Sequence, residues 1–158
     1  MEEKKYAVLI DGDNISSKYL DSILNEMTKY GIATYKRIYC DFTSQQSSKW
    51  RRLVRDSGIQ AMQQFANTVG KNATDSTLII DAMDILYTGN VDGFCIVSSD
   101  GDFTRLAIRL KESGMDVIGM GESKTPRSFR AACTVFTDLE ILYEAESEDD
   151  EISTEGCS

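Results

Sequence analysis

The stretch Ser98-Ser99-Asp100-Gly101-Asp102-Phe103 follows the apolar run 93–97 directly and precedes a helical pattern. An apolar run of strand length that breaks into small and acidic residues predicts a buried strand, and the apolar residues that return at helical spacing predict a helix after it. Ligands of open α/β sheets bind at the carboxyl edge of the strands. The stretch therefore predicts a ligand site at this edge of a sheet.

A second strand near the N-terminus ends in the same way. The apolar run 6–10 leads into Asp11-Gly12-Asp13-Asn14 and then into a helix. If the two strands are neighbours in a parallel sheet, four carboxylates converge on a small volume. Two unit charges about 4 Å apart interact by about 4 kcal/mol at an effective dielectric near 20, so protons or cations must neutralise such a cluster. A divalent metal site explains the pattern.

Length and composition indicate one globular domain. The chain has 158 residues, of which 41% are hydrophobic and 27% charged, and its four cysteines form no Cys-x-x-Cys pair. That spacing predicts reduced core thiols rather than a zinc site. The sequence shows neither a run of about 18 apolar residues nor a signal-peptide pattern, so we expect a cytoplasmic protein without a membrane partner.

The distribution of charge and the absence of histidine narrow the possible chemistry. The chain contains no histidine, which excludes Ser-His-Asp and Cys-His catalysis and metals bound by imidazole. Much of the net charge of −9 comes from residues 144–155, which include seven acidic residues and no basic ones. We expect a folded domain over residues 1–143 and a disordered acidic tail over residues 144–158. The nearly neutral body leaves room for a basic face that binds nucleic acid.

Strand and helix patterns alternate along the whole body. This alternation predicts an α/β fold, a three-layer sandwich with a mainly parallel central sheet. Residues 66–73 are expected to form an exposed loop, and Thr74 is expected to cap a helix that runs to about residue 87. Asp75 falls in line with the apolar stripe of that helix, so it should face the site, whereas Asp81 and Asp84 should be solvated.

The acidic residues at these positions form a candidate metal centre. Oxygen ligands suit Mg²⁺ or Mn²⁺, and two such ions about 4 Å apart can activate water for attack on a phosphodiester. Asn14 would serve as a neutral ligand or as a donor that orients a carboxylate. Asp13 is equally consistent with a ligand and with a helix cap, and Ser98 with a hydrogen bond to the carboxylates or with a plain turn. The candidate metal ligands are Asp11, Asp75, Asp100, Asp102 and, as the open case, Asp13.

Basic residues lie in or beside the predicted loops and could hold a phosphate backbone without reading its sequence. Trp50, among several basic residues, fits either a base-stacking platform or the core of an amphipathic helix. The candidate RNA-binding residues are Lys36, Arg37, Lys49, Arg52, Lys71, Lys124 and Arg127.

With these motifs in hand, the chain resembles the NYN domains, in particular the LabA-like bacterial branch of the PIN-like nucleases. The matching stretches span about residues 5 to 143 and are 8–15, 70–75 with 81–84, 94–103, 114–121 and 124–133. The resemblance implies a PIN-like fold and a ribonuclease that depends on Mg²⁺ or Mn²⁺. It assigns the acidic centre to Asp11, Asp75, Asp100 and Asp102, with Asn14 beside Asp11. It also implies a homodimer, for which the last helix before the tail is the candidate interface.

The predicted function is therefore a metal-dependent endoribonuclease that acts on single-stranded or structured RNA. One alternative is a non-catalytic RNA- or protein-binding module that retains the metal site. Another is a phosphatase with Asp11 as nucleophile and Asp13 as acid–base, although Ile15 and the short chain fit that pattern poorly.

Overall fold

The computed structural model describes residues 3–65 and 76–156, with side chains as far as residue 147. Its centre is a six-stranded sheet in the order β3-β2-β1-β4-β5-β6, in which every pairing is parallel. This confirms the predicted α/β class. The strands are β1 (Lys5–Asp11), β2 (Ile32–Cys40), β3 (Gln60–Gln63), β4 (Gly93–Val97), β5 (Asp116–Gly121) and β6 (Val135–Asp138).

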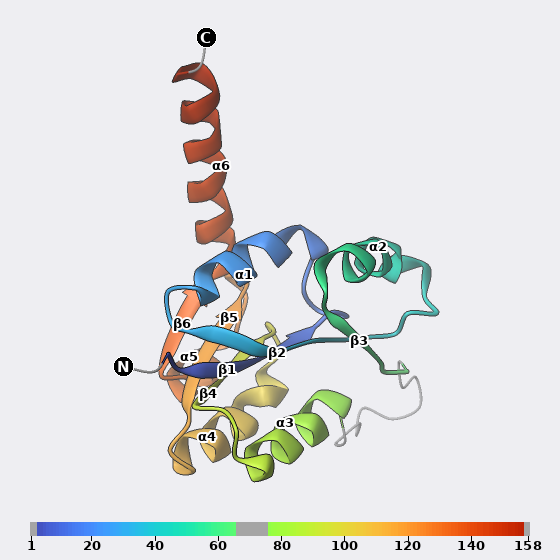
Figure 1. The fold of residues 1–158 in the computed structure, drawn as a ribbon, viewed down its shortest axis with the longest axis vertical. Helices are drawn as coiled ribbons and strands as arrows, with labels where there is room; N and C mark the ends of the chain where they lie inside the picture. Colours follow the sequence, from blue (N-terminus) through green and yellow to red (C-terminus); the bar gives the residue numbers. More distant parts are fainter. Residues whose placement is uncertain (1–2, 66–75, 157–158) are drawn as a thin grey trace.

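Helices cover both faces of this sheet (Figure 1). One face carries α1 (Leu20–Met27), α2 (Ser48–Ser57) and the start of α6 (Leu139–Gly156). The other face carries α3 (Thr77–Thr88), α4 (Thr104–Glu112) and α5 (Arg127–Ala132). Short 3₁₀ turns precede three of the helices and are η1 (Ser17–Tyr19), η2 (Gln45–Ser47) and η3 (Gly101–Phe103).

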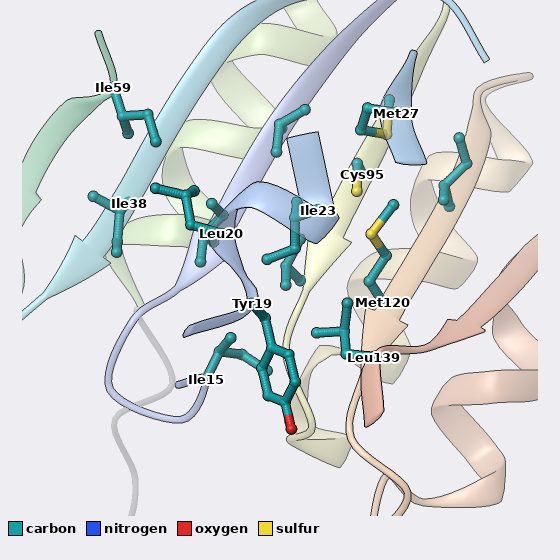
Figure 2. Close-up of a cluster of buried hydrophobic side chains, with 14 of the residues drawn as sticks. Ile15, Tyr19, Leu20, Ile23, Met27, Ile38, Ile59, Cys95, Met120 and Leu139 are labelled. Carbon is teal, nitrogen blue, oxygen red and sulfur yellow. The ribbon is translucent and has the colours of Figure 1, made fainter. Parts of the chain in front are cut away.

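Successive side chains of each strand point to opposite faces of the sheet, so the hydrophobic core has two halves. In β1, Val8 and Ile10 face the layer of α1, while Ala7 and Leu9 face the layer of α3 and α4. Figure 2 shows the first half, in which Ile23 of α1 and Leu139 of α6 belong to the same buried cluster. Each fully buried aliphatic side chain contributes about 1.5–3 kcal/mol, so the central strands are fixed from both sides.

The strand order places a topological switch point between β1 and β4. From β1 the chain continues to β2 on one side, and from β4 it continues to β5 on the other. The two connections leave in opposite directions, which opens a crevice at the carboxyl ends of β1 and β4. Both Asp-x-Asp motifs follow these two strands, as the sequence predicts.

Three local features differ from the sequence predictions. The helix predicted from Thr74 begins at Thr77, with Ser76 as its cap residue. Asp81, predicted to be solvated, is partly buried in the structure. A disordered tail was predicted from residue 144, whereas α6 is continuous to Gly156 and projects away from the sheet (Figure 1). Among the described helices, none combines the length and apolar character that a membrane span requires.

Candidate functional site

Asp11 is the buried centre of the site. It is the last residue of β1 and only 3% of its surface is exposed. Its Oδ2 accepts a hydrogen bond from Ser98 Oγ at 2.7 Å and another from Asn14 Nδ2 at 2.8 Å. The first donor follows β4 and the second follows β1, so the strands on both sides of the switch point hold one carboxylate.

Burial is the main influence on the charge of Asp11. Removal from water raises the pKa of its carboxyl to about 6, and the nearby charges of Asp13 and Asp100 add to this rise. The hydrogen bonds from Ser98 and Asn14 act in the opposite direction because they stabilise the carboxylate. A cation beside Asp11 would offset both the burial of its charge and the repulsion from Asp13 and Asp100. The hydrogen bonds from Ser98 and Asn14 would remain.

Ser98 connects Asp11 to the second acidic motif. Its Oγ accepts a hydrogen bond from the Asp100 N–H at 3.0 Å while donating to Asp11. Asp100 in turn caps η3, because its Oδ1 accepts the N–H of Asp102 at 2.9 Å. Asp100 is partly buried and Asp102 is exposed. The structure thus brings Asp11, Asn14 and Asp100 together, and it settles the role of Ser98 as a donor to the carboxylate.

Trp50 stabilises the turn after β1 by hydrogen bonds to its backbone. Its indole Nε1 donates to the carbonyl oxygens of Gly12 at 3.1 Å and Ile15 at 3.2 Å, and the side chain is 3% exposed. Gly12 has little room there, since a Cβ would lie 2.9 Å from the side chain of Ile38. Of the two roles that the sequence left open for Trp50, the structure shows the core residue.

Asp13 links two loops at the rim. Its exposed carboxylate accepts the N–H of Asp41 at 3.1 Å, which ties the loop after β1 to the loop after β2. Beside it, burial raises the pKa of the Cys40 thiol to about 12, and the charge of Asp13 adds to the effect. Cys40 is therefore a neutral thiol at pH 7. The side chains near Asp11 that could bind a metal ion would do so through oxygen atoms.

The donor set fits a hard cation, although the described part of the chain does not complete a metal site. Within residues 3–65 and 76–156, no three His, Cys, Asp or Glu side chains are close enough to hold an ion together. Asp75, the further ligand predicted from the sequence, lies outside the described residues. Asp11 at the end of β1 and Asp100 in the loop after β4 carry carboxylate oxygens, which suit Mg²⁺ or Mn²⁺ better than softer metals.

A polar groove of about 760 Å³ opens beside the acidic residues. Asp13 and Asn14 are among the residues that line it, and Lys49 and Lys124 are the two basic residues of that lining. A smaller pocket of about 390 Å³ adjoins it through the shared residues Ser16, Ser17 and Lys49 and contains Arg52. The remaining groove residues are Gly12, Ile15, Cys40, Asp41, Ser44, Gln45, Gln46, Ser47, Ser48 and Trp50.

The structure separates the other predicted RNA-binding residues from this groove. Arg37 forms an ion pair with Asp81 of α3 at 3.0 Å, and Tyr39 Oη donates to the same carboxylate at 2.7 Å. Lys36 lies partly buried in β2, and Arg127 is exposed at the start of α5. Neither lines the groove. Lys71 lies outside the described residues.

Sequence reasoning missed the loop that forms the groove wall. The sequence analysis assigns no role to residues 41–48, yet Ser44, Gln45, Gln46 and Ser48 all line the groove. The available indication was their composition, since hydroxyl and amide side chains gather there next to Lys49.

The chain is similar to a known domain family and to two proteins from other organisms. A family model described as the NYN domain matches residues 5–140. An uncharacterised protein of Methanocaldococcus jannaschii is 27% identical over 125 residues, which cover 75% of this chain and 48% of the relative. The chain thus spans about half the length of that relative. The crystal structure of a protein of unknown function from Vibrio parahaemolyticus has a TM-score of 0.68 at 17% identity, with 87% of this chain and 93% of that chain covered, and shows the same fold.

Proposed function

Because the chain belongs to the NYN domain family, whose fold is nuclease-like, we propose that it is a metal-dependent endoribonuclease of the LabA-like bacterial branch. The observation that carries the proposal is the buried Asp11, which is held by Ser98 and Asn14 beside the Asp100 loop at the switch point. The free, buried thiols of Cys40, Cys95 and Cys133 are compatible with a reducing compartment, which supports the proposal of a cytoplasmic protein.

Carboxylate oxygens would hold the metal. Asp11 and Asp100 would be the central ligands, with Asp102 and Asp13 as further candidates nearby in the sequence, and Asp75, which lies outside the described residues, remains a ligand predicted from the sequence alone. Mg²⁺ or Mn²⁺, when bound, supplies a water of lowered pKa and stabilises negative charge on the leaving oxygen. The acidic cluster alone would repel a phosphodiester, so the cation also makes substrate binding favourable.

The chain's own residues position these groups. Ser98 and Asn14 fix the orientation of the Asp11 carboxylate, and the exposed Asp102 orients the attacking water. Water loses a proton to the solvent and attacks phosphorus in line, a new P–O bond forms, the bond from phosphorus to the 3′ oxygen breaks, and that oxygen takes up a proton. The products are a 5′-phosphate and a 3′-hydroxyl.

Cleavage of a labelled single-stranded RNA tests the proposal. The wild-type protein is incubated with Mn²⁺, Mg²⁺ or EDTA, beside an Asp11→Asn, Asp100→Asn variant. A matched control carries Asp56→Asn and Asp84→Asn, which remove two exposed carboxylates from α2 and α3. We expect cleavage with either metal, none with EDTA, a loss of at least about a thousandfold in the site variant, and a wild-type rate in the control.

The other outcomes separate the alternatives. Cleavage by the site variant at the wild-type rate would show that the acidic centre is misassigned. A folded protein that binds RNA without cleaving it would favour the non-catalytic binding module. A phosphorylated Asp11 intermediate would favour the phosphatase.

A further inference from the structure

We propose that the outer surface of α3 and α4 binds a second copy of this chain in a two-fold symmetric dimer, in which α3 of each copy lies over α4 of the partner subunit. The two helices cover the face of the sheet that is opposite α1 and α2 (Figure 1). The acidic loops lie elsewhere, at the carboxyl ends of β1 and β4. The inference therefore concerns assembly and does not depend on the proposed reaction.

The outer face of α3 is apolar although it lies on the surface. Ile80 and Tyr87 are 50% and 74% exposed, and the partly buried Met83 lies between them at helical spacing. The opposite side of the helix already packs against the sheet. A surface helix normally carries charged and polar residues on its outer face, so an exposed apolar stripe indicates a contact surface. Tyrosine and methionine are also enriched in protein interfaces.

The neighbouring helix α4 extends this surface. α3 packs on β1 and α4 packs on β5, with β4 as the single strand between them. Two strand spacings of about 4.8 Å therefore separate the helices, which is the distance between packed neighbours. Ile108 of α4 is 45% exposed and adds an apolar side chain to the surface.

The exposed charges of the two helices are complementary. α4 exposes Arg105, Arg109 and Lys111 against the single carboxylate of Glu112. Residues 77–88 of α3 contain no lysine or arginine, and the exposed charge among them is the carboxylate of Asp84. Their other carboxylate is already paired with an arginine of β2. The surface thus has a negative helix and a positive helix side by side, each with exposed apolar residues.

This complementarity selects one of two ways to stack a second copy on the surface. Both helices lead from the carboxyl edge of the sheet back to its amino edge, so they run in the same direction. A two-fold axis across the helices would place each helix over its own copy, and like charges would meet. An axis along the helices places each α3 over the partner's α4, where Asp84 meets cations. Each contact then occurs twice, as an isologous interface requires.

The same axis determines where the two acidic centres lie in the dimer. Because it runs along the helices and strands, the carboxyl edges of both sheets stay at one end. The two centres therefore open to the same side, and the interface covers neither of them. Dissociation of the dimer should leave the chemistry of each centre unchanged.

Charge reversal measured by analytical ultracentrifugation tests the arrangement. One variant carries Asp84→Arg, and the other carries Arg105→Asp and Arg109→Asp. Each variant alone brings like charges together at both contacts, whereas a mixture of the two brings opposite charges together at both. We expect the dissociation constant of each variant alone to be at least about tenfold above that of wild type. The mixture should form a heterodimer with an affinity close to that of the wild-type dimer.

A second pair of variants tests the apolar stripe. Ile80→Lys combined with Tyr87→Lys should give a monomer with an unchanged far-UV circular dichroism spectrum. The matched control is Ile141→Lys, at a residue of α6 that is 66% exposed, and it should remain a dimer. A monomeric wild-type protein, or charge-reversed variants that fail to associate when mixed, would overturn the proposal. A dimer lost in the control but kept in the stripe variant would place the interface on α6 instead.

Discussion

Ser98 and Asp11 form a buried hydrogen bond of 2.7 Å that joins the two strands on either side of the switch point. Ser98 is fully buried, and the same oxygen that donates to Asp11 accepts the N–H of Asp100. One hydroxyl therefore sets the distance between the two acidic motifs. A side chain that cannot both donate and accept would uncouple them.

Ser98→Ala should lower both stability and metal affinity. The substitution leaves the Asp100 N–H and the Asp11 carboxylate without their shared partner, and an unsatisfied buried polar group costs about 1–3 kcal/mol. Chemical denaturation in EDTA and Mn²⁺ titration measure the two effects. Ser128→Ala, at an exposed position of α5, is the control. Unchanged Mn²⁺ affinity in Ser98→Ala would argue that the serine only shapes the turn.

Asp11→Asn should stabilise the metal-free protein at neutral pH. Burial raises the folded-state pKa of Asp11 from 3.8 to about 6, so its contribution to stability is present below about pH 3.8 and is lost as pH rises through 6. Asparagine carries no charge, and the variant should gain about 1–3 kcal/mol over wild type at pH 8 but not at pH 4. Urea unfolding in EDTA at both pH values measures the difference. A variant that is less stable than wild type at pH 8 would contradict the burial argument.

Trp50→Phe should impair turnover more than RNA binding. Phenylalanine keeps an aromatic ring in the core but removes the donor to Gly12 and Ile15, so the turn that carries Asn14 loses its brace. We expect kcat to fall at least about tenfold while KM for RNA changes little. Lys49→Ala is the informative comparison, because its main effect should be on KM. If Trp50→Phe raised KM alone, the side chain would belong to substrate binding.

Arg37→Ala should cost stability without weakening RNA binding. Arg37 and Asp81 are largely buried, with 23% and 16% of their side chains exposed, so removal of one partner leaves a charge poorly solvated. We expect a loss of about 1–3 kcal/mol in the free energy of unfolding and an unchanged affinity for the labelled single-stranded RNA. Weaker RNA binding by a variant of wild-type stability would return Arg37 to the RNA-binding surface.

The sequence was sufficient to predict the fold class and the two acidic loops. Strand-length apolar runs that end in Asp-x-Asp are a local pattern, and parallel topology brings such ends to one edge. The hydrogen bond from Ser98 to Asp11 is harder to predict from the sequence, because it forms only when β1 lies beside β4. The role of Trp50 is also hidden from the sequence, since its acceptors Gly12 and Ile15 lie 38 and 35 positions earlier in the chain.

Asp81 shows why a periodicity argument can place a charge wrongly. The periodicity predicts a buried stripe of α3 that consists of Leu78, Ile79, Ala82, Met83 and Leu86. The structure buries Leu78 and Ala82 together with Ile85, whereas Ile79, Met83 and Leu86 are only partly buried. Asp81 follows Leu78 by three positions and precedes Ile85 by four, so this small rotation puts it at the sheet. The hydrogen bond from Tyr39 on β2 then compensates the partly buried Asp81 carboxylate for its lost contact with water.

The acidic segment after residue 143 illustrates the opposite limitation. Composition alone predicts disorder, but the helix starts inside the body, where Leu139 is fully buried. Tyr143 packs edge-on against Tyr19, and Ser22 donates to Glu146 at 2.5 Å. These tertiary contacts nucleate a helix that its charges alone would not favour.

The hydrogen bond between Ser98 and Asp11 spans 87 positions of sequence. During synthesis the first acidic motif leaves the ribosome long before its partner strand, and until β4 inserts beside β1 the buried environment of Asp11 does not exist. The growing polypeptide therefore cannot hold the assembled centre. Whatever chemistry this centre performs therefore has to wait until β4 lies beside β1.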